Sequence, residues 1–133
     1  MDIKETIEAL AKLKGVKDTG MIRARTSYIE IERDNILDIA KKIKDEFGFD
    51  HCACISAVDY QTEFEIIYHF ARIDDNGEMI EMRVTLPRDS PTIDSITELW
   101  GGADWHEREA YDLMGIYFIG HPNLKRVLLP DGF

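Results

Sequence analysis

The chain has 133 residues, of which 44% are hydrophobic and 10% aromatic, so it can bury a core and is expected to form one domain over 1–133. Its formal net charge of −10 argues against nucleic acids and anionic lipids as partners, because both bind basic surfaces. The sequence has no apolar run of about 18 residues and no signal-peptide core near its start. The composition therefore predicts a cytosolic protein without a membrane span.

The first part of the chain has the pattern of a helix, a strand and a second helix. Apolar residues recur at helical spacing over 3–14 and Gly15 follows, so residues 1–20 are assigned to an N-terminal helical segment. Apolar and charged residues alternate over 27–32, which predicts a half-buried strand. An amphipathic helix is expected over 35–46.

Three runs typical of strands follow, at 51–60, 63–73 and 78–86, because each is rich in strand-forming residues. The segment between the last two runs ends in Asn76-Gly77, which is a strong signal for a hairpin turn. The sequence therefore predicts that these two strands pair in an antiparallel direction.

The last third of the chain is expected to return to helical structure. Residues 95–100 have helical periodicity, and a capped helix is predicted from Asp104 to Met114. Gly115 can end this helix with a left-handed backbone conformation. Together the elements predict an α+β fold: a mostly antiparallel four-stranded sheet, helices packed on one face, and an extended C-terminal tail.

Residues that commonly carry catalysis or bind metals do not form a complete motif. His106-Glu107 resembles the start of the zinc-protease pattern H-E-x-x-H, but the second histidine is replaced by Ala110. Cys52 and Cys54 are too few for a disulfide framework or four-cysteine iron–sulfur ligation, and we expect buried free thiols on one face of a strand. Glycine-rich phosphate loops, nucleophile elbows and C-x-x-C are absent from the sequence.

The histidines support a second hypothesis. A free-standing metal-dependent enzyme or small-molecule-binding domain would use His69, His106 and His121 together with a carboxylate. Such a protein would contain stoichiometric zinc or iron, or would turn over a substrate as a purified chain. A third hypothesis, a domain that only associates with itself through its tail, predicts a stable homodimer without another partner.

The segment 104–128 is unusually dense in charged, aromatic and turn residues. Arg108 and Asp112 are four residues apart, so they would be neighbours on one helical face. We predict that an ion-pair cluster fixes this helix and that the extended hook after Gly115 contacts a partner, since exposed apolar residues need a cover. The residues given this interface or structural role are Glu107, Arg108, Glu109, Asp112, Gly115, Ile116, Phe118, Gly120, His121, Pro122, Leu124, Arg126 and Leu128.

The order of these residues, E-R-E-x-[aromatic]-D, then G-I-x-F-x-G-H-P-x-L-x-R, resembles the signature of the 30-kDa subunit family of respiratory complex I. The resemblance covers roughly residues 25–130. It implies an α+β scaffold subunit that is not itself catalytic and holds no redox cofactor. Iron–sulfur clusters, a nickel–iron centre or a flavin are then expected only in partner subunits.

The resemblance also implies a place in the peripheral arm of a membrane-associated redox complex, held on the cytoplasmic face through other subunits. The expected partners are a large subunit related to the catalytic subunit of nickel–iron hydrogenases and a neighbouring iron–sulfur subunit. The sequence stops at Phe133, without the second glycine-histidine-proline segment usual in complex I members. It is therefore most similar to the short form in energy-converting membrane-bound hydrogenases.

Overall fold

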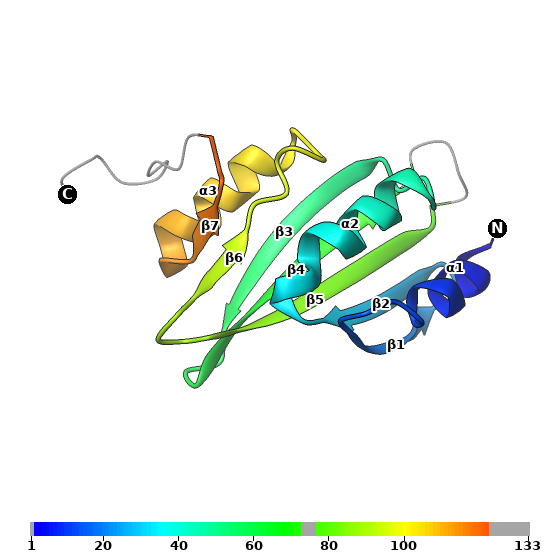
Figure 1. Ribbon diagram of the computed structural model, residues 1–133, viewed down its shortest axis with the longest axis horizontal. Coiled ribbons are helices and arrows are strands. Elements are labelled where there is room, and N and C mark those ends of the chain that lie inside the picture. Colours follow the sequence, from blue (N-terminus) through cyan, green and yellow to red (C-terminus); the bar gives the residue numbers. More distant parts are fainter. Residues whose placement is uncertain (1, 73–76, 123–133) are drawn as a thin grey trace.

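The structure is a computed structural model that describes residues 2–72 and 77–122. In Figure 1 a twisted sheet forms one layer, α2 lies across it, and α3, β6 and β7 gather at the side away from α1. The elements run in the order α1 (Ile3–Leu10), β1 (Val16–Arg23), β2 (Thr26–Ile31), a short 3-10 helix (Arg33–Asn35), α2 (Ile36–Asp45), β3 (His51–Asp59), β4 (Glu63–Ala71), β5 (Met79–Pro87), β6 (Thr92–Asp94), α3 (Ala103–Met114) and β7 (Tyr117–Ile119).

The main sheet has five strands in the order β1-β2-β5-β4-β3. All neighbouring strands are antiparallel except β2 and β5, which are parallel. The α+β class and the mostly antiparallel sheet are confirmed, whereas the count of four strands is wrong by one. A second, two-stranded parallel sheet joins β6 to β7.

The additional strand is β1, which begins at Val16 inside the segment assigned to an N-terminal helix. That assignment over 1–20 is wrong after the first turns, because α1 ends at Leu10. The sequence of β1, V-K-D-T-G-M-I-R, does not alternate cleanly between apolar and polar residues. It lies at the sheet edge, where only one neighbour constrains it, so periodicity carried no strand signal.

Gly15 connects α1 to β1 and lies against the start of α2. Its φ is +91°, which favours glycine, and a Cβ at this position would collide with the side chain of Asn35. The Gly15 carbonyl also accepts a hydrogen bond from the backbone N–H of Glu32 at 2.7 Å. The connection is therefore fixed between the end of β2 and α2.

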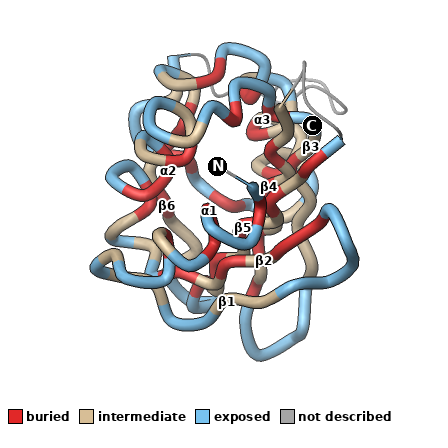
Figure 2. Tube along the Cα trace, turned by 90° about the vertical axis from the view of Figure 1, so that its right-hand side faces the viewer, coloured by how far each residue is buried: buried red, intermediate tan, exposed pale blue. Residues whose placement is uncertain are grey.

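The core lies on one face of the sheet, between the strands and the three helices. Figure 2 shows that buried positions concentrate on the strands and on the inward sides of the helices. Alternate residues of the central strands face this core, while the residues between them lie on the opposite, half-buried face. The core-facing residues of β2, β4 and β5 include Ile29, Ile31, Phe64, Ile66, Tyr68, Phe70, Ile80, Met82, Val84 and Leu86.

The helix expected over 95–100 is not formed. The segment makes a single turn in which the N–H groups of Leu99 and Trp100 both donate to the carbonyl of Ile96, at 3.0 Å. Ile96 and Trp100 are both buried, and the Trp100 ring stacks on Phe70 at 4.3 Å between centroids. One turn brings residues four apart onto the core, so the sequence had the spacing of a helix without its length.

The other predicted elements are confirmed as β2, α2, β3, β4, β5 and α3, with ends within a few residues. The strands β4 and β5 are antiparallel neighbours, as a hairpin requires. Of the predicted turn, Asn76 lies outside the described residues. Gly115 ends α3 at φ +73°, and its N–H donates to the carbonyl of Tyr111 at 2.9 Å, which confirms the left-handed cap.

Candidate functional site

Glu107 is the buried anchor of α3. Its side chain is fully buried, although the helix carrying it lies at the edge of the fold. The Ser95 hydroxyl donates to Oε1 at 2.6 Å, and the N–H of Ile96 donates to Oε2 at 2.9 Å. Both donors lie just after β6, so one carboxylate fastens the signature helix to the segment that precedes it.

His121 fastens the turn after β7 to the first turn of α3. Its side chain is fully buried, with Nε2 at 2.9 Å from Oδ1 of Asp104 and 3.9 Å from Oε1 of Glu107. Both carboxylates come from α3, whereas His121 follows β7 in the chain. The two ends of the segment from α3 to the turn are therefore joined, and His121 has a structural role.

The burial of Glu107 raises its pKa above the ordinary value. Desolvation is the main cause, while the hydrogen bonds from Ser95 and Ile96 and the nearby His121 act in the opposite direction. The charge of Glu107 and, more strongly, burial raise the pKa of the Cys52 thiol to about 12. Cys52 therefore stays protonated at neutral pH and is neither a nucleophile nor a thiolate ligand.

The raised pKa of Glu107 gives a pH dependence of stability. Because the folded chain holds this proton more tightly than the unfolded chain, the contribution is present below the ordinary carboxyl pKa of 4.5 and is lost as pH rises through the folded value. We expect the unfolding free energy of the native chain to fall relative to that of Glu107→Gln over this window. Urea denaturation of both proteins from pH 4.5 upward measures the difference, and a constant or growing difference would contradict the assignment.

The expected ion pair between Arg108 and Asp112 is not formed. The Arg108 guanidinium instead stacks over the Trp105 ring, 5.7 Å from its centroid, and its Nε is buried with no acceptor among the described residues. Glu109 lies 3.8 Å from His106, one turn earlier on α3. The ion-pair cluster predicted from helical spacing is thus replaced by contacts that leave the α3 surface directed away from Glu107.

The hook alternates between buried and exposed residues. Ile116 and Phe118 are fully buried in the core of this chain, so they hold the hook in place and are not available to a partner. Tyr117 and Ile119 are 52% and 49% exposed. Pro122 is exposed in the turn that follows Gly120. The predicted contact residues Leu124, Arg126 and Leu128 lie outside the described residues.

The two cysteines are free, but they lie on opposite faces of β3. Cys52 pairs with Phe70 on the core face, whereas Cys54 pairs with His69 on the open face. The expectation of one shared face is wrong because the register shifts between the two cysteines, as in a β-bulge. Ala53 is the extra residue, and nothing in the sequence marks it.

Each histidine of the metal-site hypothesis has its own carboxylate neighbour in a different place. His69 lies on the open sheet face with Nε2 at 3.4 Å from Glu81, His106 lies beside Glu109, and His121 is buried beside Asp104. Over residues 2–72 and 77–122 there is no group of three or more His, Cys, Asp or Glu side chains that could hold a metal ion. The described geometry therefore gives the metal-enzyme hypothesis no support.

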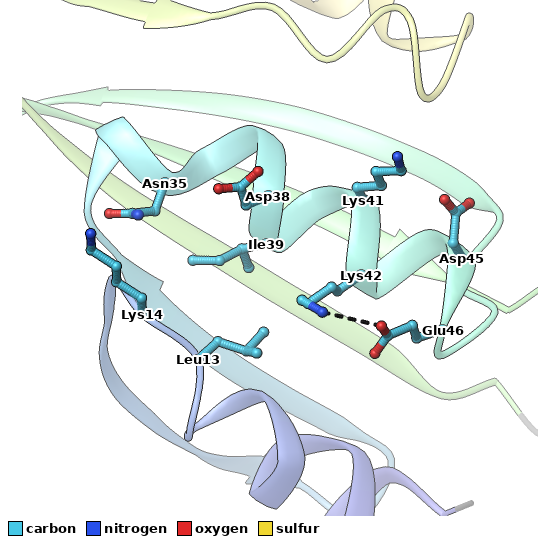
Figure 3. Close-up of a pocket in the computed structure, with 9 residues that line it drawn as sticks. All are labelled: Leu13, Lys14, Asn35, Asp38, Ile39, Lys41, Lys42, Asp45 and Glu46. Atoms are coloured by element: carbon cyan, nitrogen blue, oxygen red, sulfur yellow. Dashed lines mark hydrogen bonds and ion pairs between the residues drawn. The ribbon is translucent and has the colours of Figure 1, made fainter.

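A groove of about 440 Å³ lies between the connection after α1 and the outer side of α2 (Figure 3). The apolar side chains of Leu13 and Ile39 contribute to its floor, and Lys42 pairs with Glu46 across its rim at 3.1 Å. Lysines and carboxylates are present in equal number, so the rim favours neither an anion nor a cation. The charged lining residues are Lys14, Asp38, Lys41, Lys42, Asp45 and Glu46.

Four large apolar side chains form an exposed surface on α3 and β7, which we call the α3–β7 surface. Trp105 and Leu113 of α3 are 50% and 64% exposed, and Tyr117 and Ile119 of β7 are the other two. Sequence reasoning singled out the segment but assigned the partner contacts to Ile116 and Phe118. The alternation over 116–119 was the available signal, because residues on either side of a strand face opposite ways.

Comparison with known proteins identifies the family. The model of the family described as respiratory-chain NADH dehydrogenase, 30-kDa subunit, matches residues 29–133. The chain belongs to this family. The resemblance inferred from the signature segment is thus confirmed, and the family's members are subunits of oxidoreductase complexes of the respiratory chain.

Two relatives show how the similarity is spread along the chain. The first, from the F(420)H(2) dehydrogenase of Methanosarcina mazei, is 34% identical over 98% of this chain and 85% of its own length. The second, from the NADH-quinone oxidoreductase of Moorella thermoacetica, is 41% identical over 77% of this chain and 70% of its own length. Each is a single subunit of the enzyme that names it. Family membership therefore rests on most of the domain and not on the signature alone.

Solved structures have the same fold. The trypsin-resistant fragment of Nqo5 superposes with a TM-score of 0.81 at 28% identity, covering 93% of this chain and 100% of the fragment. A chain of the membrane-bound sulfane sulfur reductase, an archaeal respiratory membrane complex, gives 0.84 at 22% identity over 97% and 77%, which shows the fold alone. No helix in the described part of the chain is long and apolar enough to cross a membrane.

Proposed function

We propose that this chain is a non-catalytic structural subunit in the peripheral arm of a membrane-associated redox complex, either an energy-converting hydrogenase or a complex I-like dehydrogenase. It docks on the large subunit related to nickel–iron hydrogenases, beside an iron–sulfur subunit. Its place is on the cytoplasmic face of the membrane, where the partner subunits hold it. The observation that carries this proposal is the exposed α3–β7 surface.

The α3–β7 surface is concentrated in one short segment. Eight large hydrophobic side chains are exposed among the described residues, and four of them lie within 105–119, so they are not scattered singly over the fold. Contiguous exposed apolar residues commonly mark protein–protein interfaces. The buried Glu107, His121 and Phe118 hold the backbone beneath them, so the surface is rigid before a partner arrives.

The proposed role of the chain is geometric, and redox centres belong to its partners. The buried carboxylate and histidine are engaged with each other and with backbone or hydroxyl groups, and the buried thiol is protonated. Each group is therefore used to join elements of the fold. Iron–sulfur clusters, a nickel–iron centre or a flavin would lie in neighbouring chains.

Affinity purification of the tagged chain from native membranes tests the proposal. We expect a hydrogenase-like large subunit to co-purify with the native chain, and Leu113→Glu to reduce its recovery at least tenfold because a charge is placed in an apolar interface. Leu37→Glu is the matched control, since Leu37 is also exposed, at 41%, but lies on α2. Its recovery should equal that of the native chain.

Two results would contradict the proposed function. The first is a chain that purifies as a homodimer or alone under conditions in which the redox complex stays intact. The second is stoichiometric zinc or iron in the purified chain by elemental analysis, which would favour the free-standing enzyme. Equal losses for Leu113→Glu and Leu37→Glu would instead remove the α3–β7 surface from the proposal.

A further inference from the structure

We propose that Arg108 and Trp105 form a receptor for a carboxylate side chain of the neighbouring subunit. This inference rests on the proposed function and deepens it, because it names the chemistry that the partner must present at the α3–β7 surface. The site consists of a guanidinium stacked on a half-exposed indole ring.

Arg108 differs from the other arginines whose contacts are known. Its Nε is buried without an acceptor, and no carboxylate of the described residues lies within ion-pair distance of its guanidinium. The chain carries 26 acidic against 16 basic residues, so carboxylates for pairing are abundant. The arginines that are paired within the chain bind as Arg72 to Glu78, Arg83 to Glu81 and Arg88 to Asp59.

The local geometry keeps the cation from its nearest acidic neighbours on the same helix. Glu107 points into the core and accepts hydrogen bonds from Ser95 and Ile96. Glu109 is directed to His106 at 3.8 Å. The guanidinium is therefore held along the outer side of α3 by stacking on Trp105, with its charge not neutralised there.

An anion is the required ligand because docking would remove water from this charge. A buried or desolvated arginine without a counter-ion is strongly unfavourable, whereas a planar guanidinium binds a carboxylate through two parallel hydrogen bonds. Stacking on an indole face leaves the N–H groups at the edge of the guanidinium plane available for such a ligand. When the partner is a polypeptide, the matching anion is an aspartate or glutamate side chain.

Carbodiimide cross-linking of the purified complex tests the inference directly. This reagent joins an amine to a carboxylate already in ion-pair contact, so Arg108→Lys keeps the charge and supplies the amine. We expect a cross-link from position 108 to an aspartate or glutamate of another subunit, identified by peptide mass spectrometry. Arg88→Lys is the control, because Arg88 pairs with Asp59 and should cross-link within the chain.

A second variant keeps the test decisive if the lysine variant does not assemble. Arg108→Gln should reduce recovery of the large subunit about 30-fold or more, since it leaves the partner's carboxylate buried and unpaired. Normal recovery of Arg108→Gln, or a cross-link of Arg108→Lys only to carboxylates of its own chain, would overturn the inference. Neither result would affect the proposed function, which fails only if the native chain does not co-purify with the redox subunits.

Discussion

Glu107→Ala is expected to lower the free energy of unfolding by about 3–4 kcal/mol, because it removes a buried acceptor that serves two donors. The Ser95 hydroxyl and the Ile96 N–H would lose their partner, and His121 would lose one of its two carboxylates. The substitution also leaves a void beneath α3. The loss is kept moderate at neutral pH by the desolvation that already raises the pKa of Glu107.

Urea denaturation followed by circular dichroism measures this effect at pH 7. Glu109→Ala is a matched control on the same helix, because the Glu109 carboxylate is 38% exposed and makes only a 3.8 Å contact with His106. It should change stability by less than about 0.5 kcal/mol. Equal effects of the two substitutions would show that Glu107 is not the anchor of α3.

Phe118→Ala is expected to cost about 3–4 kcal/mol, the usual loss when a large aromatic side chain is removed from a core. Phe118 is 1% exposed, and its strand β7 pairs with β6 in the small parallel sheet. Since both β6 and the hook depend on this contact, hydrogen exchange should increase over 92–94 and 117–119. The measurement combines the unfolding midpoint with exchange rates in these two segments.

Tyr117→Ala provides the comparison, because the neighbouring side chain is 52% exposed. We expect it to change the stability of the isolated chain by no more than about 0.5 kcal/mol, as for most surface substitutions. In the complex its effect should be on assembly. A destabilised Tyr117→Ala together with a stable Phe118→Ala would mean that the faces of β7 have been assigned the wrong way round.

The sequence predicted the elements whose patterns are long and regular. The strands β4 and β5 alternate over nine residues each, and α2 has a continuous apolar face, so local periodicity was sufficient there. The edge strand β1 escaped because its residues face solvent as often as the core. The turn at 96–100 was mistaken for a helix because its two buried residues have helical spacing.

The signature segment was located correctly, but the roles of its residues required three dimensions. Spacing placed Arg108 beside Asp112, yet stacking on Trp105 decided its position. The partners of Glu107 are a serine and a backbone amide 12 and 11 residues earlier, and no local rule points to such contacts. Long-range hydrogen bonds of this kind depend on how β6 and α3 pack together.

The parallel pairing of β2 with β5 has a consequence for the synthesis of the molecule. Thr26 is aligned with Met79, 53 residues further along the chain. A two-stranded ribbon is marginal in water by itself, so β1 and β2 gain lasting support only once β5 has left the ribosome. The beginning of the polypeptide therefore waits for its middle, and the signature helix, synthesised later still, closes a sheet that has just been completed.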